Sequence, residues 1–177
     1  MRIKKIEKIS KIPTLTQIAF GIGDIGSNPD FFKIMEYCRN NGYTYVIPNV
    51  TINGHKLTDE YADKLAEICG AVSVSMYDPK DICYDAVKKL TDRGMKQINI
   101  HRLVAEETFN SCLEVMLDSL EDERLKALNA IVFLSLKPIG NRNNLNKLGT
   151  EKFKKLIDFA FENNKKLVLI LVLHLCF

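Results

Sequence analysis

The sequence is poor in the features that mark several protein classes. It has no tryptophan, five prolines and nine glycines in 177 residues, which excludes collagen-like and low-complexity chains. The formal net charge is +3 at pH 7, too weak to indicate nucleic acid or an anionic membrane as a partner. With 46% hydrophobic and 27% charged residues, the composition favours one globular domain.

Closely spaced cysteines are also missing. The five cysteines are Cys38, Cys69, Cys83, Cys112 and Cys176. They form no CxxC, no zinc pair and no tight cluster, so we predict no metal ligands in this chain. Without a disulfide framework or a signal peptide, the chain is predicted to be cytoplasmic with reduced thiols.

Short β-rich segments alternate with helical segments at intervals of about 30 residues, the length of a βα unit. The expected strands are Gln17–Phe20, Thr44–Ile47, Ala71–Met76, Gln97–Leu103, Ala130–Leu136 and Leu167–Leu173. The expected helices are Pro29–Asn41, Thr58–Cys69, Pro79–Arg93, Thr108–Leu120 and Thr150–Asn163. This alternation predicts a parallel sheet with right-handed crossovers.

Three of these strands carry polar side chains toward their carboxyl ends. Because side chains alternate between faces, Ser73 and Ser75 share one face, and so do Asn99 and His101. We expect Ser135 to add a polar group in the next strand. A doubly wound sheet would bury both faces with apolar residues, whereas a barrel points its site residues inward at the strand ends. We therefore predict an α/β fold, a partial (β/α) barrel with about five βα units and a last strand.

A glycine-rich turn follows the first expected strand, where residues 21–26 read GIGDIG. This matches the GxGxxG pattern that binds a dinucleotide pyrophosphate at a helix N-terminus. However, residues 44–54 contain no Asp or Glu for the ribose, and the helix is expected only from Pro29. A tight turn that needs the positive φ of glycine is a second interpretation.

The turn also resembles one in the radical S-adenosylmethionine superfamily. Residues 20–24 (FGIGD), followed by 28–31 (NPDF), are similar to the GGE-type turn after the second strand of that family. Further similar segments follow in the family's order: 51–54 (TING), 57–60 (LTDE), 72–75 (VSVS), 87–90 (VKKL) with Gly94, and 136–140 (LKPIG). The resemblance covers about residues 15–165.

The resemblance implies a cofactor and the residues that bind it. Gly21, Gly23 and Asp24 would meet the amino group of S-adenosylmethionine. Ser75, Asn99 and His101 would face its ribose or carboxylate, and Asn53 belongs to the same binding set. The family cleaves S-adenosylmethionine reductively to a 5′-deoxyadenosyl radical, which abstracts hydrogen from a substrate.

The chain departs from the family pattern in two ways. Ile22 and Asp24 stand where the family has Gly and Glu, and Asp is shorter than Glu by one methylene. The CxxxCxxC loop that holds the family's [4Fe–4S] cluster is absent from the sequence. We therefore interpret the chain as a truncated core that is inactive alone. The alternatives are a non-catalytic pseudoenzyme, a subunit completed by a partner chain that supplies the missing strand, and another α/β-barrel nucleotide-binding enzyme.

Both ends differ from the βα pattern. Residues 1–14 form a basic leader, 15–165 the partial barrel and 166–177 an apolar tail. The tail is too short to span a bilayer, which takes about 20 residues. It is interpreted either as a last strand or as a frameshifted end, because suitable codons read in another frame spell GFDSCSAPLF, which resembles a cysteine-bearing segment of superfamily relatives. The substrate, a small molecule or a peptide, cannot be read from the sequence.

One further pair of residues is a catalytic candidate. Glu106 and Glu107 follow the fourth β segment and could form an acid/base pair, or lie as solvated residues in the first turn of a helix.

Overall fold

A computed structural model describes residues 15–40, 46–136, 144–163 and 168–171. The leader 1–14, residues 172–177 of the tail and most of the LKPIG segment lie outside the described residues, so the interpretations of these segments stay predictions.

Six strands and five α-helices alternate along the described residues. The strands are β1 (Gln17–Gly23), β2 (Ile47–Ile52), β3 (Ala71–Ser75), β4 (Ile98–Val104), β5 (Ala130–Ser135) and β6 (Val168–Leu171). The helices are α2 (Phe31–Asn40), α3 (Asp59–Ile68), α4 (Asp81–Thr91), α5 (Phe109–Glu121) and α6 (Thr150–Asn163). Two 3-10 turns, η1 (Ile25–Ser27) and η2 (Glu123–Leu125), precede α2 and β5.

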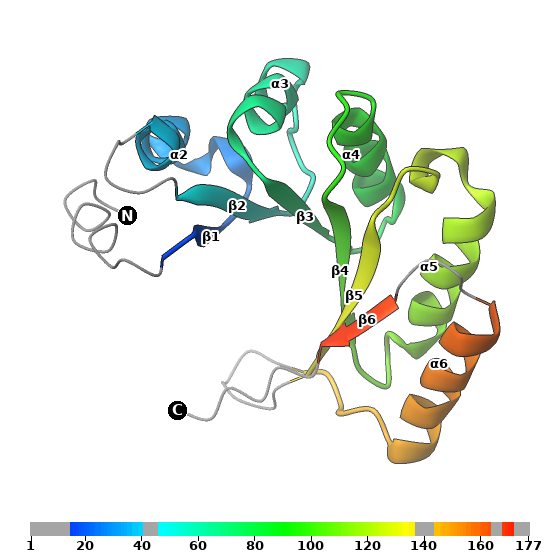
Figure 1. The fold of residues 1–177 in the computed structure, drawn as a ribbon. Helices are drawn as coiled ribbons and strands as arrows, with labels where there is room; N and C mark the ends of the chain where they lie inside the picture. Colours follow the sequence, from blue (N-terminus) through cyan, green and yellow to red (C-terminus); the bar gives the residue numbers. More distant parts are fainter. Residues whose placement is uncertain (1–14, 41–45, 137–143, 164–167, 172–177) are drawn as a thin grey trace.

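The strands lie side by side in chain order, and every neighbouring pair is parallel. Figure 1 shows the sheet as an arc with the helices along its convex side. The predicted partial (β/α) barrel is therefore confirmed. A dinucleotide binds where strand order reverses, and the six described strands contain no such reversal.

The main core lies between the convex face of the sheet and the helices. The apolar positions of β3 and β4 are buried there: Val72, Val74, Ile98 and Ile100. Each such side chain contributes about 1.5–3 kcal/mol by its burial. The alternate positions of both strands face the concave side and are only half-buried, so the inward polar face predicted for these two strands is confirmed.

β2 lies later in the sequence than predicted, and residues 44 and 45 of the expected strand are outside the described residues. The expected strand ends at Ile47, whereas β2 continues through Pro48, a residue without the N–H that a central strand donates. In the structure Pro48 pairs with Ile18 of β1 and precedes Asn49, the first residue of β2 paired with β3. The missing donor therefore interrupts no bond of the β2–β3 ladder.

The expectation for Ser135 is wrong. Ser135 is in register with Val104, which belongs to the buried, helix-facing set of β4. The partner of the inward-facing His101 is instead the apolar Val132. The polar inner face thus ends at β4, because the period of two along β5 places its serine on the opposite side.

The helices α3 and α2 differ in how well their starts agree with the expected ranges. Thr58 caps α3, since its hydroxyl accepts a hydrogen bond from the Tyr61 amide at 3.2 Å. α2 begins at Phe31 and not at Pro29. The Asn28 side chain accepts from the Asp30 amide at 3.0 Å and forms a separate turn before the helix.

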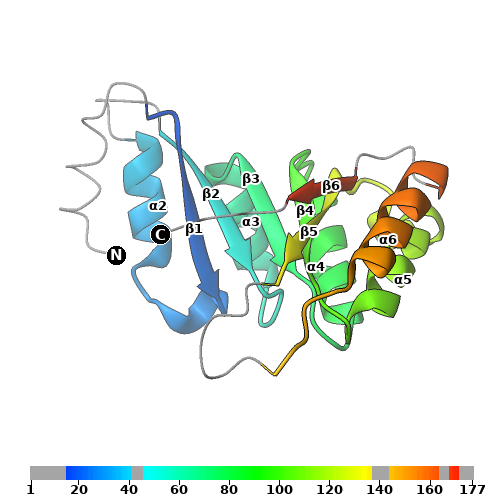
Figure 2. The ribbon, with the colours of Figure 1, turned by 90° about the horizontal axis from the view of Figure 1, so that it is seen from below.

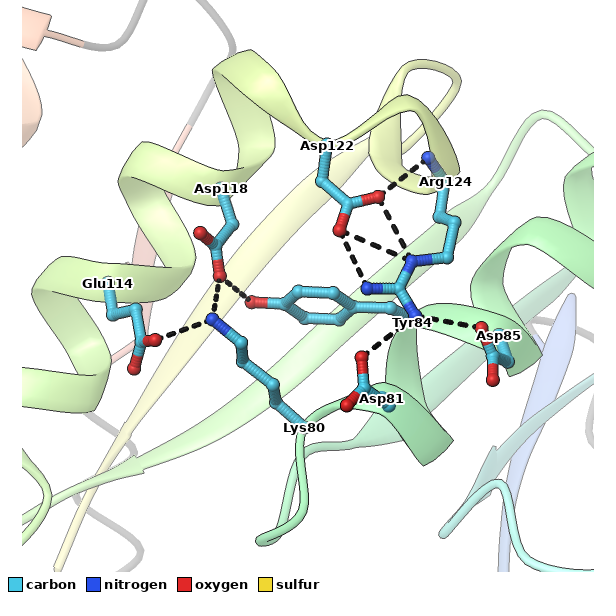
Figure 3. Close-up of polar contacts among 8 residues, drawn as sticks. All are labelled: Lys80, Asp81, Tyr84, Asp85, Glu114, Asp118, Asp122 and Arg124. Carbon is cyan, nitrogen blue, oxygen red and sulfur yellow. Dashed lines mark hydrogen bonds and ion pairs between the residues drawn. The ribbon is translucent and has the colours of Figure 1, made fainter.

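A polar network fixes the neighbouring α4, α5 and η2 (Figure 3). The fully buried Tyr84 donates its hydroxyl to Asp118 at 2.7 Å, and the Lys80 ammonium bonds the same oxygen at 2.7 Å. The Arg124 guanidinium lies 5.1 Å from the centre of the Tyr84 ring. It pairs with three carboxylates, those of Asp81, Asp85 and Asp122. The network lies on the convex side and stabilises the helix layer behind the sheet.

No helix among the described residues has both the length and the apolar content needed to cross a membrane.

Candidate functional site

The candidate site lies where the strands end. Figure 2 shows the arrowheads of β1, β2 and β3 at one edge of the sheet. In parallel α/β barrels this carboxyl-terminal edge carries the functional groups. Five of the seven site residues predicted from sequence lie at this edge: Gly23, Asp24, Asn53, Ser75 and His101.

The ends of β1 and β2 are tied together through the backbone. The Asn53 amide donates to the Gly23 carbonyl at 3.0 Å. Gly23 has a φ of +70°, which a residue with a side chain rarely adopts. The glycine therefore lets β1 turn sharply into η1, and it brings Asp24 beside the loop that follows β2.

Asp24 uses its two carboxylate oxygens for different partners. Oδ1 accepts from the Gly26 amide at 3.1 Å and caps η1. Oδ2 pairs with the Lys56 ammonium at 2.9 Å. The Lys56 ammonium and the Gly26 amide hold the pKa of the Asp24 carboxyl below its usual value. Asp24 is therefore an anion at neutral pH, and it holds a cation at the strand edge.

A small hollow beside this loop brings Asn53 and Ser75 together. Its lining comes from the ends of β2 and β3 and the start of α4: Asn53, His55, Ser75, Tyr77, Asp78, Pro79, Ile82 and Cys83. The carboxamide of Asn53 accepts from the His55 amide at 3.0 Å. Hydroxyl, amide and aromatic groups thus surround a space about the size of a water molecule.

His101 lies next to Ser75 across the sheet. The two residues are in register between β3 and β4, and the Met76 amide donates to the His101 carbonyl at 2.8 Å. Burial lowers the pKa of the His101 imidazole below its usual value. The ring is therefore neutral at pH 7 and can donate and accept one hydrogen bond each.

Gly21 and Asn99 lie deeper in the sheet. Gly21 is in register with Thr51, Ser73 and Asn99 on the neighbouring strands, and these four residues form the layer next to the edge. The amide oxygen of Asn99 accepts from the Asn129 side chain at 2.8 Å. Asn99 is two residues before His101, about 7 Å further from the edge along the strand. The structure thus separates these two predicted residues from the other five.

Two charged residues near the edge are not among the site residues predicted from sequence. Lys56 follows Gly54 in the β2–α3 loop, and nothing in the local sequence marks it. Arg102 is 5% exposed, and it donates to the Met76 carbonyl at 2.8 Å and to the Ser111 hydroxyl. Strand alternation could have found Arg102, because it shares the buried face of Ile98 and Ile100.

Glu106 and Glu107 hold the segment that leads into α6. Glu106 accepts from the Gly149 amide at 2.8 Å and pairs with Lys152. Glu107 accepts from the Asn146 amide at 3.0 Å and from its side chain at 2.8 Å. Lys152 is the main cause that keeps the pKa of Glu106 low, whereas a general acid needs a raised pKa. The pair has a structural role, and it precedes α5 instead of lying in its first turn.

The described cysteines do not fit an iron–sulfur cluster. Cys38, Cys69, Cys83 and Cys112 are all buried, each on or directly after a different helix. Burial raises their pKa values to about 11 for Cys38 and Cys112 and about 12 for Cys69 and Cys83. No three metal-ligating residues come together among the described residues. Cluster ligation needs several adjacent thiolates, which these positions do not provide.

Comparisons with known proteins give a match only among solved structures. No family model matches the sequence, and no curated protein matches it. The chain is similar to anSMEcpe, a radical S-adenosylmethionine anaerobic sulfatase-maturating enzyme. The structure of native anSMEcpe with bound S-adenosylmethionine and Cp18Cys peptide has a TM-score of 0.69 at 20% identity, covering 96% of this chain and 55% of that chain. With S-adenosylmethionine alone, the TM-score is 0.68 at 21% identity, covering 96% and 54%.

This likeness concerns the fold. The chain spans about half the length of the anSMEcpe chains that it matches. The chain therefore has the α/β partial-barrel fold of the anSMEcpe structures.

Proposed function

We propose that the chain binds S-adenosylmethionine at the carboxyl-terminal edge of its sheet, as the cofactor-binding part of a radical S-adenosylmethionine enzyme. The observation that carries this proposal is the ionised Asp24, held at the end of β1 with one oxygen facing a cation. The methionine part of S-adenosylmethionine carries an ammonium group, which suits such a carboxylate. Solved structures of the same fold contain this cofactor.

The other site residues have complementary roles in the proposal. The backbone of Gly21 and Gly23 lets the ligand approach β1 closely, since glycine has no side chain there. Ser75 and the neutral His101 offer hydrogen bonds to the ribose or the carboxylate. Asn53 lines the same hollow as Ser75. Asn99 would act from the deeper layer.

We propose no step of radical chemistry for this chain alone. Its described cysteines are dispersed among four helices, so the cluster ligands would come from a partner chain or from further sequence of a longer polypeptide. Under this proposal the chain is a truncated, inactive core. The same dispersion favours a second candidate, a non-catalytic binding subunit.

We also propose a cytoplasmic location, because the cysteine spacing offers no disulfide framework. Cell fractionation tests the location, and sequencing of the flanking DNA for an in-frame CxxxCxxC tests the truncation.

The binding proposal is tested by calorimetric titration with S-adenosylmethionine and S-adenosylhomocysteine. The Asp24→Asn variant should bind both about tenfold or more weakly, because a hydrogen bond to a charged group is lost. Asp30→Asn is the matched control, since Asp30 is an exposed aspartate in the same turn region. It should bind like the unchanged chain.

A third ligand separates amino-acid recognition from nucleoside recognition. 5′-Methylthioadenosine has the adenosine part without the ammonium and the carboxylate, so Asp24→Asn should not change its affinity. If neither S-adenosyl ligand binds, or if Asp24→Asn and Asp30→Asn behave alike, the proposed site is wrong. Tighter binding of ATP than of S-adenosylhomocysteine would favour a different nucleotide-binding enzyme.

A further inference from the structure

The carboxylate proposed for ligand binding already holds an ammonium group of the chain itself. The Lys56 ammonium lies 2.9 Å from Oδ2 of Asp24. The other oxygen of Asp24 is occupied by the Gly26 amide and caps η1. A ligand ammonium that approaches Asp24 from the strand edge therefore meets an oxygen that Lys56 already uses.

The backbone of the β2–α3 loop directs Lys56 to this place. Gly54 has a φ of +78° and Lys56 a φ of +55°, so the chain reverses its direction within three residues. The Asn53 side chain stabilises the reversal by accepting from the His55 amide. A lysine with positive φ is uncommon, and here the turn brings the Lys56 ammonium to Asp24.

The side chain of Lys56 is free to leave. It is 76% exposed, whereas that of Asp24 is 31% exposed. An exposed ion pair contributes little to stability, so its loss is readily offset by a new partner for Asp24. The lysine ammonium and a ligand α-ammonium carry the same charge and the same three donors. Both therefore fit the same carboxylate oxygen, where two ammonium groups side by side would repel each other.

We propose that Lys56 is a resident competitor at the Asp24 carboxylate, which a ligand with a primary ammonium must displace in order to bind. This inference rests on the proposed function. It makes Asp24 a site selective for ligands with an α-ammonium group, and it makes Lys56 the residue that limits their affinity.

The experiment compares calorimetric titrations of the unchanged chain, Lys56→Met and Lys33→Met. Methionine keeps the length and apolar stem of lysine and removes the ammonium. Lys33→Met is the matched control, because Lys33 is also exposed and paired with an aspartate, Asp30, at 3.5 Å. Lys56→Met should bind S-adenosylhomocysteine about two- to fivefold more tightly, the range that an exposed ion pair allows. Lys33→Met should not change the affinity.

5′-Methylthioadenosine provides the second measurement, since it has no ammonium to compete with Lys56. Its affinity should be equal in the unchanged chain and Lys56→Met. Weaker binding of S-adenosylhomocysteine by Lys56→Met would overturn the inference, because Lys56 would then contact the ligand carboxylate. An unchanged affinity, with binding still lost in Asp24→Asn, overturns the inference and leaves the proposed function intact. If no variant binds S-adenosylhomocysteine, both are overturned. Thermal melts of all variants confirm that each is folded.

Discussion

Gly54 is a position where a side chain conflicts with the fold. Its φ is +78°, and an added Cβ would lie 3.0 Å from the Ile82 carbonyl and 3.2 Å from the Ala86 Cβ. Gly94 has a similar φ of +82°, but an added Cβ there meets no described atom within 4 Å. Alanine substitutions at Gly54 and Gly94 therefore separate the cost of backbone strain from the cost of steric crowding.

We predict that Gly54→Ala lowers the free energy of unfolding by about 2–3 kcal/mol and Gly94→Ala by about 1 kcal/mol. Urea denaturation measures both values. Equal losses in the two variants would show that the approach of α4 to the loop is not tight.

The ionisation of Asp24 sets the pH range of ligand binding. Its pKa is lowered in the folded chain, first by Lys56 and then by the Gly26 amide. The contribution of such a carboxylate is fully present above its unfolded pKa, near 3.9. It is lost as the pH falls through the lower folded pKa. His101 is kept neutral by burial, so it adds no titration near pH 7.

We therefore predict a constant affinity for S-adenosylhomocysteine from about pH 7 to pH 8, with the contribution of Asp24 lost only below about pH 4. Titrations in buffers of equal ionic strength measure this. A midpoint between pH 6 and pH 7 would assign the ammonium contact to a histidine-dependent site instead of Asp24.

The packing of α4 against α5 depends on one buried hydroxyl group. Tyr84 is fully buried and donates to Asp118, and the Lys80 ammonium bonds the same carboxylate. Burial is the first cause that raises the pKa of Tyr84 above its usual value, and the bond to Asp118 is the second. The hydroxyl therefore stays protonated around neutral pH and donates to Asp118.

Tyr84→Phe should lower the free energy of unfolding by about 1 kcal/mol, the contribution of one hydrogen bond to a carboxylate that keeps its other partner. The control is Tyr77→Phe, since Tyr77 is 60% exposed and its loss of a hydroxyl should leave the stability unchanged. Chemical denaturation compares the two. A loss for Tyr84→Phe no larger than that for Tyr77→Phe would contradict the role of the network.

Local sequence signals explain most elements and only part of the site. The sequence predicted a helix from Thr58, and its cap is local, since Thr58 bonds the Tyr61 amide three residues away. Ser75 and His101 were placed on one face because strand alternation is local. Asp24 and Lys56 are 32 positions apart, so their contact depends on the register of β1 and β2. The prediction differs from the structure at Pro48 and Ser135 for the same reason. Neighbouring strands determine where a proline is tolerated in β2 and which face of β5 points inward.

At the scale of the whole molecule, the positions of the cysteines decide what the chain can hold. Four of them are separated on the inner sides of the helices, and burial raises their pKa values to about 11 or 12. Thiols with such pKa values are protonated at pH 8 and bind iron poorly. We predict that anaerobic reconstitution with iron and sulfide gives no stable [4Fe–4S] cluster on this chain alone.

Absorbance after desalting measures the reconstitution, and a partner chain or a longer polypeptide with CxxxCxxC would be the positive control. A brown protein that keeps an iron–sulfur absorption band would show that the folded chain rearranges its cysteines around the metal.

The central claim is that a ligand with an ammonium group binds at the carboxyl-terminal edge of β1, β2 and β3. The most direct measurement is the change in amide chemical shifts of the ¹⁵N-labelled chain on titration with S-adenosylhomocysteine. We predict that the largest shifts fall on Gly23, Asp24, Asn53 and Ser75, and that Asp24→Asn removes them. Shifts that are absent, or that cluster at the opposite edge of the sheet around Asn129, would contradict the claim.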